Sequence, residues 1–355
     1  MSRPLVVAAL VTALAAPAVA RSAPPGKPPT PPPPTAKPAP SWAQAEIRTV
    51  VAHGLMAKSV ALFRPNDPLT QGALAALVAG LLHKPSLATA YANANAPVTM
   101  AQLDGRLVQA LGLGDAAGEF ASAASAAGLA PPARFGTEVV ARLLGLRTNH
   151  PARQDDLELL PTDPATRAEA AFSAARILGL GAGDLASVEQ DALTFALPQL
   201  GPWQKKVLQT AVRFIGYPYV WGGTSETTEA PFGVTAHGGF DCSGFVWRVF
   251  KLQPYLGGAA LGTTLRGRTT FAMSGEVPAA KRIAIAKLGP ADVLFWGAHG
   301  PRSKPSEVDH TGIYLGNGWF IHSSSYGVAL AQLDGWYKQR FAWARRPLVE
   351  AGLGR

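Results

Sequence analysis

The chain changes character near residue 200, and this change limits the folds that it can adopt. From Trp42 to about residue 181 the sequence is rich in Ala and Leu, has helical periodicity and contains few β-branched clusters. Beyond about residue 215, short apolar runs alternate with glycine-rich turns, which is typical of strands. The sequence therefore predicts an all-α domain over residues 42–182, followed by an α+β domain over residues 194–350.

The first region contains a repeated helix start. The stretch Pro-Leu-Thr at 68–70 recurs as Pro-Val-Thr at 97–99 and Pro-Ala-Thr at 164–166, each time before a helical run of about a dozen residues. The threonine is a good N-cap, and Gln102 or Glu169 three positions later predicts a capping box. Further helical runs cover 45–56, 119–128 and 137–146. We expect a helix–loop–helix array whose neighbours bury each other's apolar faces.

The second region contains a helix and several strands. Residues 203–214 have one apolar helical face, and Gly216 ends the run. Strand composition occurs at 291–296, 309–315, 319–324, 328–330 and 341–345, with a hairpin signal at Gly316-Asn317-Gly318. These elements predict a cysteine-bearing helix packed on an antiparallel sheet.

Cys242 is the only cysteine, so this chain cannot form an internal disulfide. It follows a glycine-rich loop and opens the apolar run 245–250, which predicts a buried helix. A thiol at a helix N-terminus lies where unpaired N–H groups and the helix dipole favour the thiolate. The alternative is a small buried hydrophobic residue, which free cysteines usually are.

A nucleophilic cysteine needs a base and a group that orients the base, and the hairpin offers His310 and His322. A two-residue Asn-Gly turn would place them on opposite faces of the hairpin. We therefore expect a three-residue loop, 316–318, that pairs 315 with 319 and has Gly318 in a left-handed conformation. His310 would be the base, His322 would fix its tautomer, and backbone N–H groups near Cys242 would form an oxyanion hole. We expect no metal site and no cofactor, because no close ligand spacing occurs.

The N-terminus predicts export. Arg3, a short apolar run over 5–16 and the small residues Ala18-Val19-Ala20 indicate a signal peptide over residues 1–20. Residues 21–41 predict a proline-rich spacer, and no segment is long and apolar enough for a transmembrane helix. The formal charge of +9 favours acidic wall polymers or anionic lipid as partners and, outside a cell, makes nucleic acid a weaker candidate.

Five motifs in the second region, in order, resemble those of the NlpC-type cell-wall peptidases. They are residues 219–223 (Tyr-Val-Trp-Gly-Gly), 240–245 (Phe-Asp-Cys-Ser-Gly-Phe), 289–293 (Gly-Pro-Ala-Asp-Val), 310–318 (His-Thr-Gly-Ile-Tyr-Leu-Gly-Asn-Gly) and 320–322 (Phe-Ile-His). The resemblance covers residues 203–347. It departs from the family in the long loop 224–239 and in Ala291, which replaces a usual glycine.

The resemblance implies a papain-like fold and a Cys-His-His triad in which Cys242 is the nucleophile, His310 the base and His322 the orienting residue. It implies cleavage of the bond from γ-D-glutamate to the diamino acid in peptidoglycan stem peptides. The subsite for the D-glutamyl side would be lined by Tyr219, Asp241 and Ser243.

The repeats of the first region resemble the S-layer homology module, whose members bind acidic wall polymers. The signature Thr-Arg-Ala-Glu is intact only at 166–169, which implies polymer binding by Arg167 and Glu169. The other two copies lack the arginine, so a helical spacer or groove-shaping region is the alternative.

Together these features predict a secreted, monomeric cysteine endopeptidase of the cell envelope, either wall-associated or periplasmic, that acts on peptidoglycan stem peptides. One alternative is a non-catalytic wall-binding or envelope-structural protein that uses the repeats and the basic charge. Another is a wall amidase or acyltransferase that uses the same triad, since a thiolate can run those reactions too.

Overall fold

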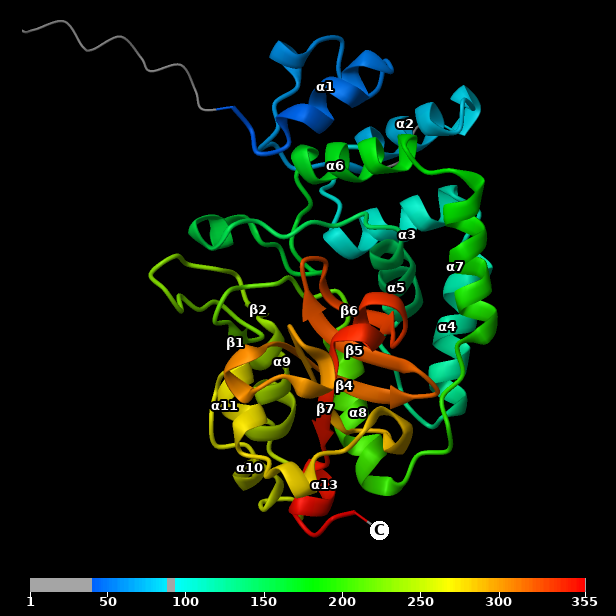
Figure 1. The fold of residues 1–355 in the computed structure, drawn as a ribbon. Coiled ribbons are helices and arrows are strands. Elements are labelled where there is room, and N and C mark those ends of the chain that lie inside the picture. Colours follow the sequence, from blue (N-terminus) through cyan, green and yellow to red (C-terminus); the bar gives the residue numbers. More distant parts are fainter. Residues whose placement is uncertain (1–39, 88–92, 355) are drawn as a thin grey trace, which may run out of the picture. The chain divides into compact units, whose positions relative to one another are not determined.

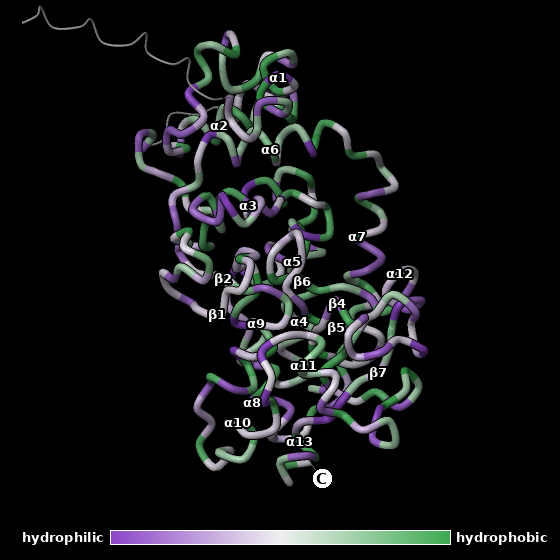
Figure 2. The backbone as a smooth tube through the Cα atoms, turned by 60° about the vertical axis from the view of Figure 1, so that its left-hand side comes forward, coloured by the Kyte–Doolittle hydropathy of each residue, from purple (hydrophilic) through white to green (hydrophobic). Residues whose placement is uncertain are grey.

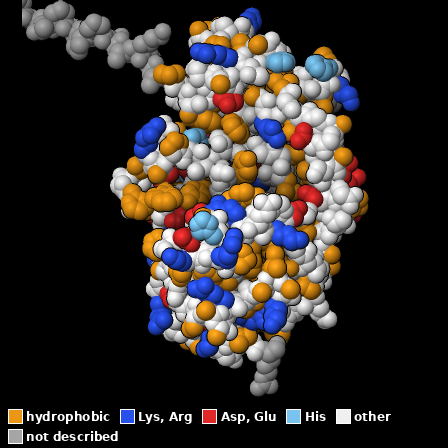
Figure 3. All heavy atoms as spheres, in the orientation of Figure 1, with side chains coloured by type: hydrophobic (Ala, Val, Ile, Leu, Met, Phe, Trp, Pro, Cys, Tyr) orange, Lys and Arg blue, Asp and Glu red, His pale blue; other side chains and the backbone are white. Residues whose placement is uncertain are grey.

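The computed structural model describes residues 40–87 and 93–354, and Ser41–Arg355 form one compact unit (Figure 1). The predicted signal peptide and nearly all of the proline-rich spacer lie outside the described residues. Across the described part of the chain, every helix is too short or too polar to cross a bilayer. Basic side chains are spread over the face seen in Figure 3 and do not gather into one patch.

Helices make up the regular structure of the first region. The runs predicted at 45–56, 119–128 and 137–146 correspond to α1, α4 and α5, and the three repeat starts open α2, α3 and α6. One further helix, α7, follows α6. The bounds are α1 Gln44–Ala52, α2 Gln71–Leu81, α3 Met100–Ala110, α4 Gly114–Ala126, α5 Phe135–Leu143, α6 Arg167–Leu178 and α7 Ala182–Thr194.

The three repeat starts bind one another in a ring. The Leu69 N–H donates to the Ala165 carbonyl at 2.7 Å, the Val98 N–H to the Leu69 carbonyl at 2.8 Å, and the Ala165 N–H to the Val98 carbonyl at 2.8 Å. Each of these residues lies just before a threonine N-cap, where the extended backbone has N–H and C=O groups to pair. Segments separated by up to about a hundred residues are thereby held together at one point.

The predicted capping boxes form in one of two cases. Thr99 and Gln102 exchange both hydrogen bonds, at 3.3 and 3.0 Å. At the third repeat Thr166 accepts from the Glu169 N–H at 3.2 Å, but the Glu169 carboxylate does not return to the cap. The expectation of a second box was wrong because Glu169 turns inward, where its carboxylate lies 3.6 Å from Arg147.

The second region is α+β with an antiparallel sheet, as predicted. Its larger sheet has the strand order β6-β5-β4-β3-β7, and α9 packs against β4 and β5. The strands are β1 Thr224–Ser225, β2 Gly239–Phe240, β3 Val293–Gly297, β4 Val308–Gly316, β5 Trp319–Ser324, β6 Gly327–Gln332 and β7 Phe341–Arg345. The helices are α8 Pro202–Arg213, α9 Cys242–Trp247, α10 Leu261–Thr264, α11 Thr270–Gly275, α12 Gly335–Arg340 and α13 Pro347–Glu350.

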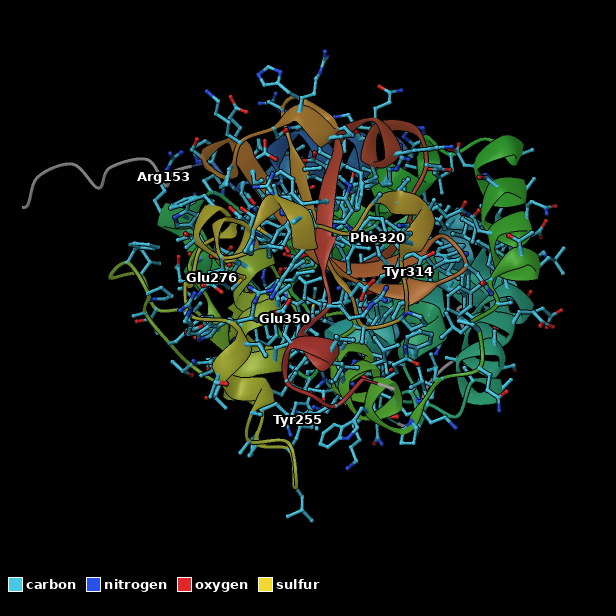
Figure 4. The ribbon with its side chains drawn as sticks, turned by 60° about the horizontal axis from the view of Figure 1, so that its bottom comes forward. Arg153, Tyr255, Glu276, Tyr314, Phe320 and Glu350 are labelled. Atoms are coloured by element: carbon cyan, nitrogen blue, oxygen red, sulfur yellow. The ribbon has the colours of Figure 1, made fainter. Side chains whose placement is uncertain are left out.

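Ion pairs, each with one buried partner, anchor strand β7 at the edge of this sheet. Arg345 donates to Glu276, just after α11, at 2.9 Å and to Glu350 of α13 at 3.1 Å; Figure 4 labels both glutamates. The next residue, Arg346, binds the buried Asp292 at 2.7 Å. Asp292 and Arg346 thus join the 289–293 motif to the end of the sheet.

The two regions share one hydrophobic core. Phe120 of α4 and Phe195, just after α7, pack against Trp319 of β5, with ring centroids 5.9 and 5.1 Å away. Arg142 of α5 donates to the Gly216 carbonyl at 2.8 Å. Helix α7 has hydrophilic and hydrophobic residues along its length (Figure 2) and buries Val188 and Ala192. Because the core is continuous, the helical region supports the sheet directly.

Candidate active site

Cys242 is the first residue of α9 and is buried, with 8% of its surface exposed. Asp241 is the N-cap, and its carboxylate accepts a hydrogen bond from the Gly244 N–H at 2.5 Å. This cap holds the turn that leads into the helix and fixes the position of the thiol.

The hairpin brings the two histidines together, although its turn differs from the one predicted. Gly316 pairs with Trp319 across a two-residue turn, Asn317-Gly318, in which both residues have positive φ. The expected three-residue loop was therefore wrong, while the left-handed Gly318 was right. An extra residue at Leu315 forms a bulge, so that Tyr314 pairs with Phe320 and Ile313 with Ile321.

The bulge restores the register that the three-residue loop would have given. Continuing this register places residue 312 opposite 322, so His310 and His322 share one face of the hairpin. His310 Nε2 lies 2.7 Å from His322 Nδ1, within hydrogen-bond distance. His310 Nδ1 is the ring nitrogen left for another partner.

Cys242 meets this pair through the neighbouring backbone. The N–H groups of Thr311 and Ser243 donate hydrogen bonds to the Cys242 sulfur and lower its pKa, but burial and the Asp241 charge outweigh them and raise the pKa to about 12. Since Thr311 follows His310 in β4, this contact places the thiol against the strand that carries His310.

Burial also favours the neutral form of both histidines. It lowers the pKa of His310 to about 4, and burial together with the His310 charge lowers the pKa of His322 well below its ordinary value. Aromatic rings enclose the pair: Trp296 lies 5.4 Å from His310, and Phe320 lies 4.9 Å from His322. A charge on the thiol or on the imidazole alone is therefore disfavoured, and an opposite charge on the other group is what would stabilise it.

The three predicted subsite residues lie around the turn that carries Cys242. The pKa of Tyr219 is raised by burial and by the charges of Cys242 and Asp241, so its hydroxyl is protonated. Ser243 Oγ donates to Asp241 Oδ1 at 3.0 Å.

Arg268 completes this cluster, and the sequence reasoning gave it no role. It donates to Ser243 Oγ at 2.6 Å and to Asp241 Oδ1 at 3.1 Å. The stretch Arg-Thr-Thr at 268–270, which leads into α11, was the only sequence signal available for it.

A cavity of about 410 Å³ opens beside His310. Its lining includes Tyr219 and His310, which were predicted, and five residues that were not singled out: Asn149, Ser324, Ser325, Trp336 and Tyr337. Trp221, within the 219–223 motif, completes the lining. Asn149 comes from the helical region, and its position could not be read from the local sequence.

The predicted wall-polymer residues lie elsewhere. Arg167 lines a groove of about 570 Å³, but its Nε and Nη2 donate to the Phe63 and Met56 carbonyls, both at 2.8 Å. Glu169 is 5% exposed, so its carboxylate does not reach the groove surface.

Among the described residues, no group of three or more His, Cys, Asp or Glu side chains is arranged to hold a metal ion. Cys242, His310 and His322 are side chains of the types that acyl-transfer chemistry uses, namely a nucleophile, a base and a group that orients the base.

Residues 216–346 match the model of the NlpC/P60 family. The chain is 37% identical over 142 residues to the probable peptidoglycan endopeptidase LytE of Bacillus subtilis. The aligned stretch covers 40% of this chain and 34% of LytE. It is 27% identical over 124 residues to the γ-D-glutamyl-L-lysine dipeptidyl-peptidase of Bacillus subtilis, 35% of this chain and 33% of that protein. These matches span about a third of each relative.

Among solved structures, the NlpC/P60 domain of the peptidoglycan hydrolase SagA is 27% identical, with 40% of this chain and 97% of that chain covered and a TM-score of 0.28. The match of residues 216–346 to the NlpC/P60 family and the likeness to peptidoglycan endopeptidases are consistent with a cysteine-type peptidoglycan hydrolase.

Proposed function

We propose that this protein is an exported cysteine endopeptidase that cleaves the γ-D-glutamyl to diamino-acid bond of peptidoglycan stem peptides. The observation that carries the proposal is the His310–His322 pair, 2.7 Å apart, beside Cys242 inside the stretch that matches the NlpC/P60 family. The signal-peptide pattern of residues 1–20 is the support for export.

The proposed reaction starts from a neutral thiol and a neutral imidazole. As Cys242 Sγ bonds to the scissile carbonyl carbon, its proton passes to His310 Nδ1, and the two opposite charges stabilise each other. Backbone N–H groups at the start of α9 would stabilise the oxyanion. The C–N bond then breaks, and His310 gives its proton to the leaving amine.

The second half of the reaction releases the product. His310 takes a proton from a water molecule as the water oxygen attacks the thioester carbon. The C–S bond then breaks, His310 returns that proton to the sulfur to restore the neutral thiol, and the glutamyl carboxyl group is freed and loses its own proton to solvent. His322 acts on His310 alone, by holding Nε2 so that Nδ1 faces the sulfur.

On the substrate side, Tyr219, Asp241 and Ser243 are proposed to bind the D-glutamyl part of the stem peptide. Binding of wall polymer by the helical region is not part of the proposal, because Glu169 is buried beside Arg147.

Mass spectrometry of muropeptides digested by the purified protein tests the bond that is cut. We expect fragments that end in D-glutamate and complementary fragments that begin with the diamino acid. Fragments that have lost the whole stem peptide would indicate an amidase and would overturn the proposed bond. Products joined to an added amine would indicate acyl transfer.

A further inference from the structure

The segment 147–163, between α5 and α6, reaches from the helical region to the peptidase domain. At one end, Arg147 Nε donates to Asp104 Oδ2 at 3.0 Å inside the helical region. At the other end, Asp163 Oδ2 lies 2.6 Å from His237 Nδ1 in the long loop that leads to Cys242. The segment therefore connects the core of one region with a loop that borders the active site of the other.

Asp155, within this segment, holds the other loop that borders the site. Asp155 is 4% exposed, and its carboxylate accepts a hydrogen bond from the backbone N–H of Trp221. Its charge also contributes to the raised pKa of Tyr219. The segment is thus hydrogen-bonded to the aromatic turn that carries Tyr219 and Trp221.

Asn149 is the residue of this segment that lines the cavity beside His310. It shares the 410 Å³ cavity with His310, Tyr219 and Trp221. Its Oδ1 atom is buried, and no donor among the described residues lies within hydrogen-bond distance of it. A buried amide oxygen without a donor costs about 1–3 kcal/mol, so a ligand that supplies one would regain that free energy.

The position of Asn149 is fixed by its neighbours on both sides. Arg147 is bound to Asp104, and the His150 N–H donates to Glu158 Oε1 at 2.6 Å. His150 also packs edge-on against Trp42, with ring centroids 4.5 Å apart. An acceptor held in this way needs little ordering when a ligand binds, which favours specific recognition.

We propose that Asn149 is a specificity-determining residue of the peptidase, and that its amide oxygen accepts a hydrogen bond from a backbone N–H of the stem peptide bound between Tyr219 and His310. The inference rests on the proposed function, which names the stem peptide as substrate. It gives the helical region a direct part in substrate selection, since this region supplies one wall of the cavity.

Binding to an inactive protein tests the inference without relying on hydrolysis. In the full chain carrying C242A, calorimetry gives the Kd for a synthetic stem peptide that contains the γ-D-glutamyl to diamino-acid bond. We expect C242A/N149A and C242A/N149L to bind about tenfold more weakly than C242A, because both remove the acceptor while leucine keeps the volume. C242A/N66A is the matched control, because Asn66 is an exposed asparagine of the same region, and it should bind like C242A.

Peptides methylated at one backbone nitrogen at a time identify the donor. One of them should bind C242A about tenfold more weakly and should show no further loss with C242A/N149A. Equal affinity of C242A and C242A/N149A would overturn the inference and leave the proposed function intact. No binding of the peptide to C242A would overturn the proposed substrate and this inference with it.

Discussion

Helices α6 and α9 begin in the same way but use the residues after the cap differently. Thr166 caps α6 and Asp241 caps α9, each accepting from an N–H three positions later. After Thr166, Arg167 and Glu169 bind groups inside the helical region. After Asp241, Cys242 contacts the backbone beside His310. A helix-start motif therefore does not reveal whether its polar residues serve the fold or a site, because distant partners decide it.

Of the changes considered, replacement of His310, beside α9, should have the largest effect, and this effect is on activity. We expect H310A to lower kcat/KM for a stem peptide about a thousandfold, because the buried thiol loses the group that takes its proton. H299A is the matched control, since the His299 side chain is 63% exposed and lies 3.8 Å from Glu307, and it should leave the activity unchanged. A loss of less than tenfold in H310A would show that another group is the base.

In the helical region, the buried Arg147 should contribute to the stability of the fold and not to catalysis. We expect R147A to lower the free energy of unfolding by about 3 kcal/mol or more, because it leaves the buried Asp104 carboxylate without its main partner. Urea denaturation at pH 8 measures this, and R48A, at an exposed position of α1, should change it by less than about 0.5 kcal/mol. A similar small change in R147A would contradict a structural role for this cluster.

The two regions should also respond to pH in opposite directions. Burial lowers the pKa of His310 to about 4, from about 6.5 when unfolded, so its contribution is present above pH 6.5 and is lost as the pH falls towards 4. Burial raises the pKa values of Glu138 and Glu169 to about 7, so their contribution is present below about pH 4.5 and is lost as the pH rises through 7.

Urea midpoints between pH 4.5 and 8 separate these contributions. Between pH 8 and 4.5 the free energy of unfolding of H310Q/H322Q should fall less than that of wild type, by about 2 kcal/mol. Above pH 6 the free energy of unfolding of E138Q/E169Q should fall less than that of wild type. Parallel pH profiles for wild type and H310Q/H322Q would refute the account of the histidines.

The smallest effect is expected at Ala291, which has φ of 70°. A291G removes a buried methyl group but relieves a left-handed alanine, so the two effects should cancel to within about 0.5 kcal/mol. A170G, at a buried position of α6, should cost about 1–2 kcal/mol because no strain is relieved. An equal cost at both positions would mean that Ala291 is unstrained.

Sequence periodicity was enough to locate the repeat starts, α8 and the strands of the larger sheet, because these depend on local apolar patterning and turn residues. It also identified the pair His310 and His322. It missed the bulge at Leu315, since a two-residue turn with a bulge and a three-residue loop leave the same residues on each face. Asn149 was beyond reach, because its place beside His310 depends on how two regions pack.

Release of fragments from purified sacculi by wild type and C242A tests the central claim most directly. The account predicts stem-peptide fragments from wild type and none from C242A at equal protein concentration and equal folded fraction. Equal release by the two proteins would contradict it, because the reaction would then proceed without the thiol of Cys242.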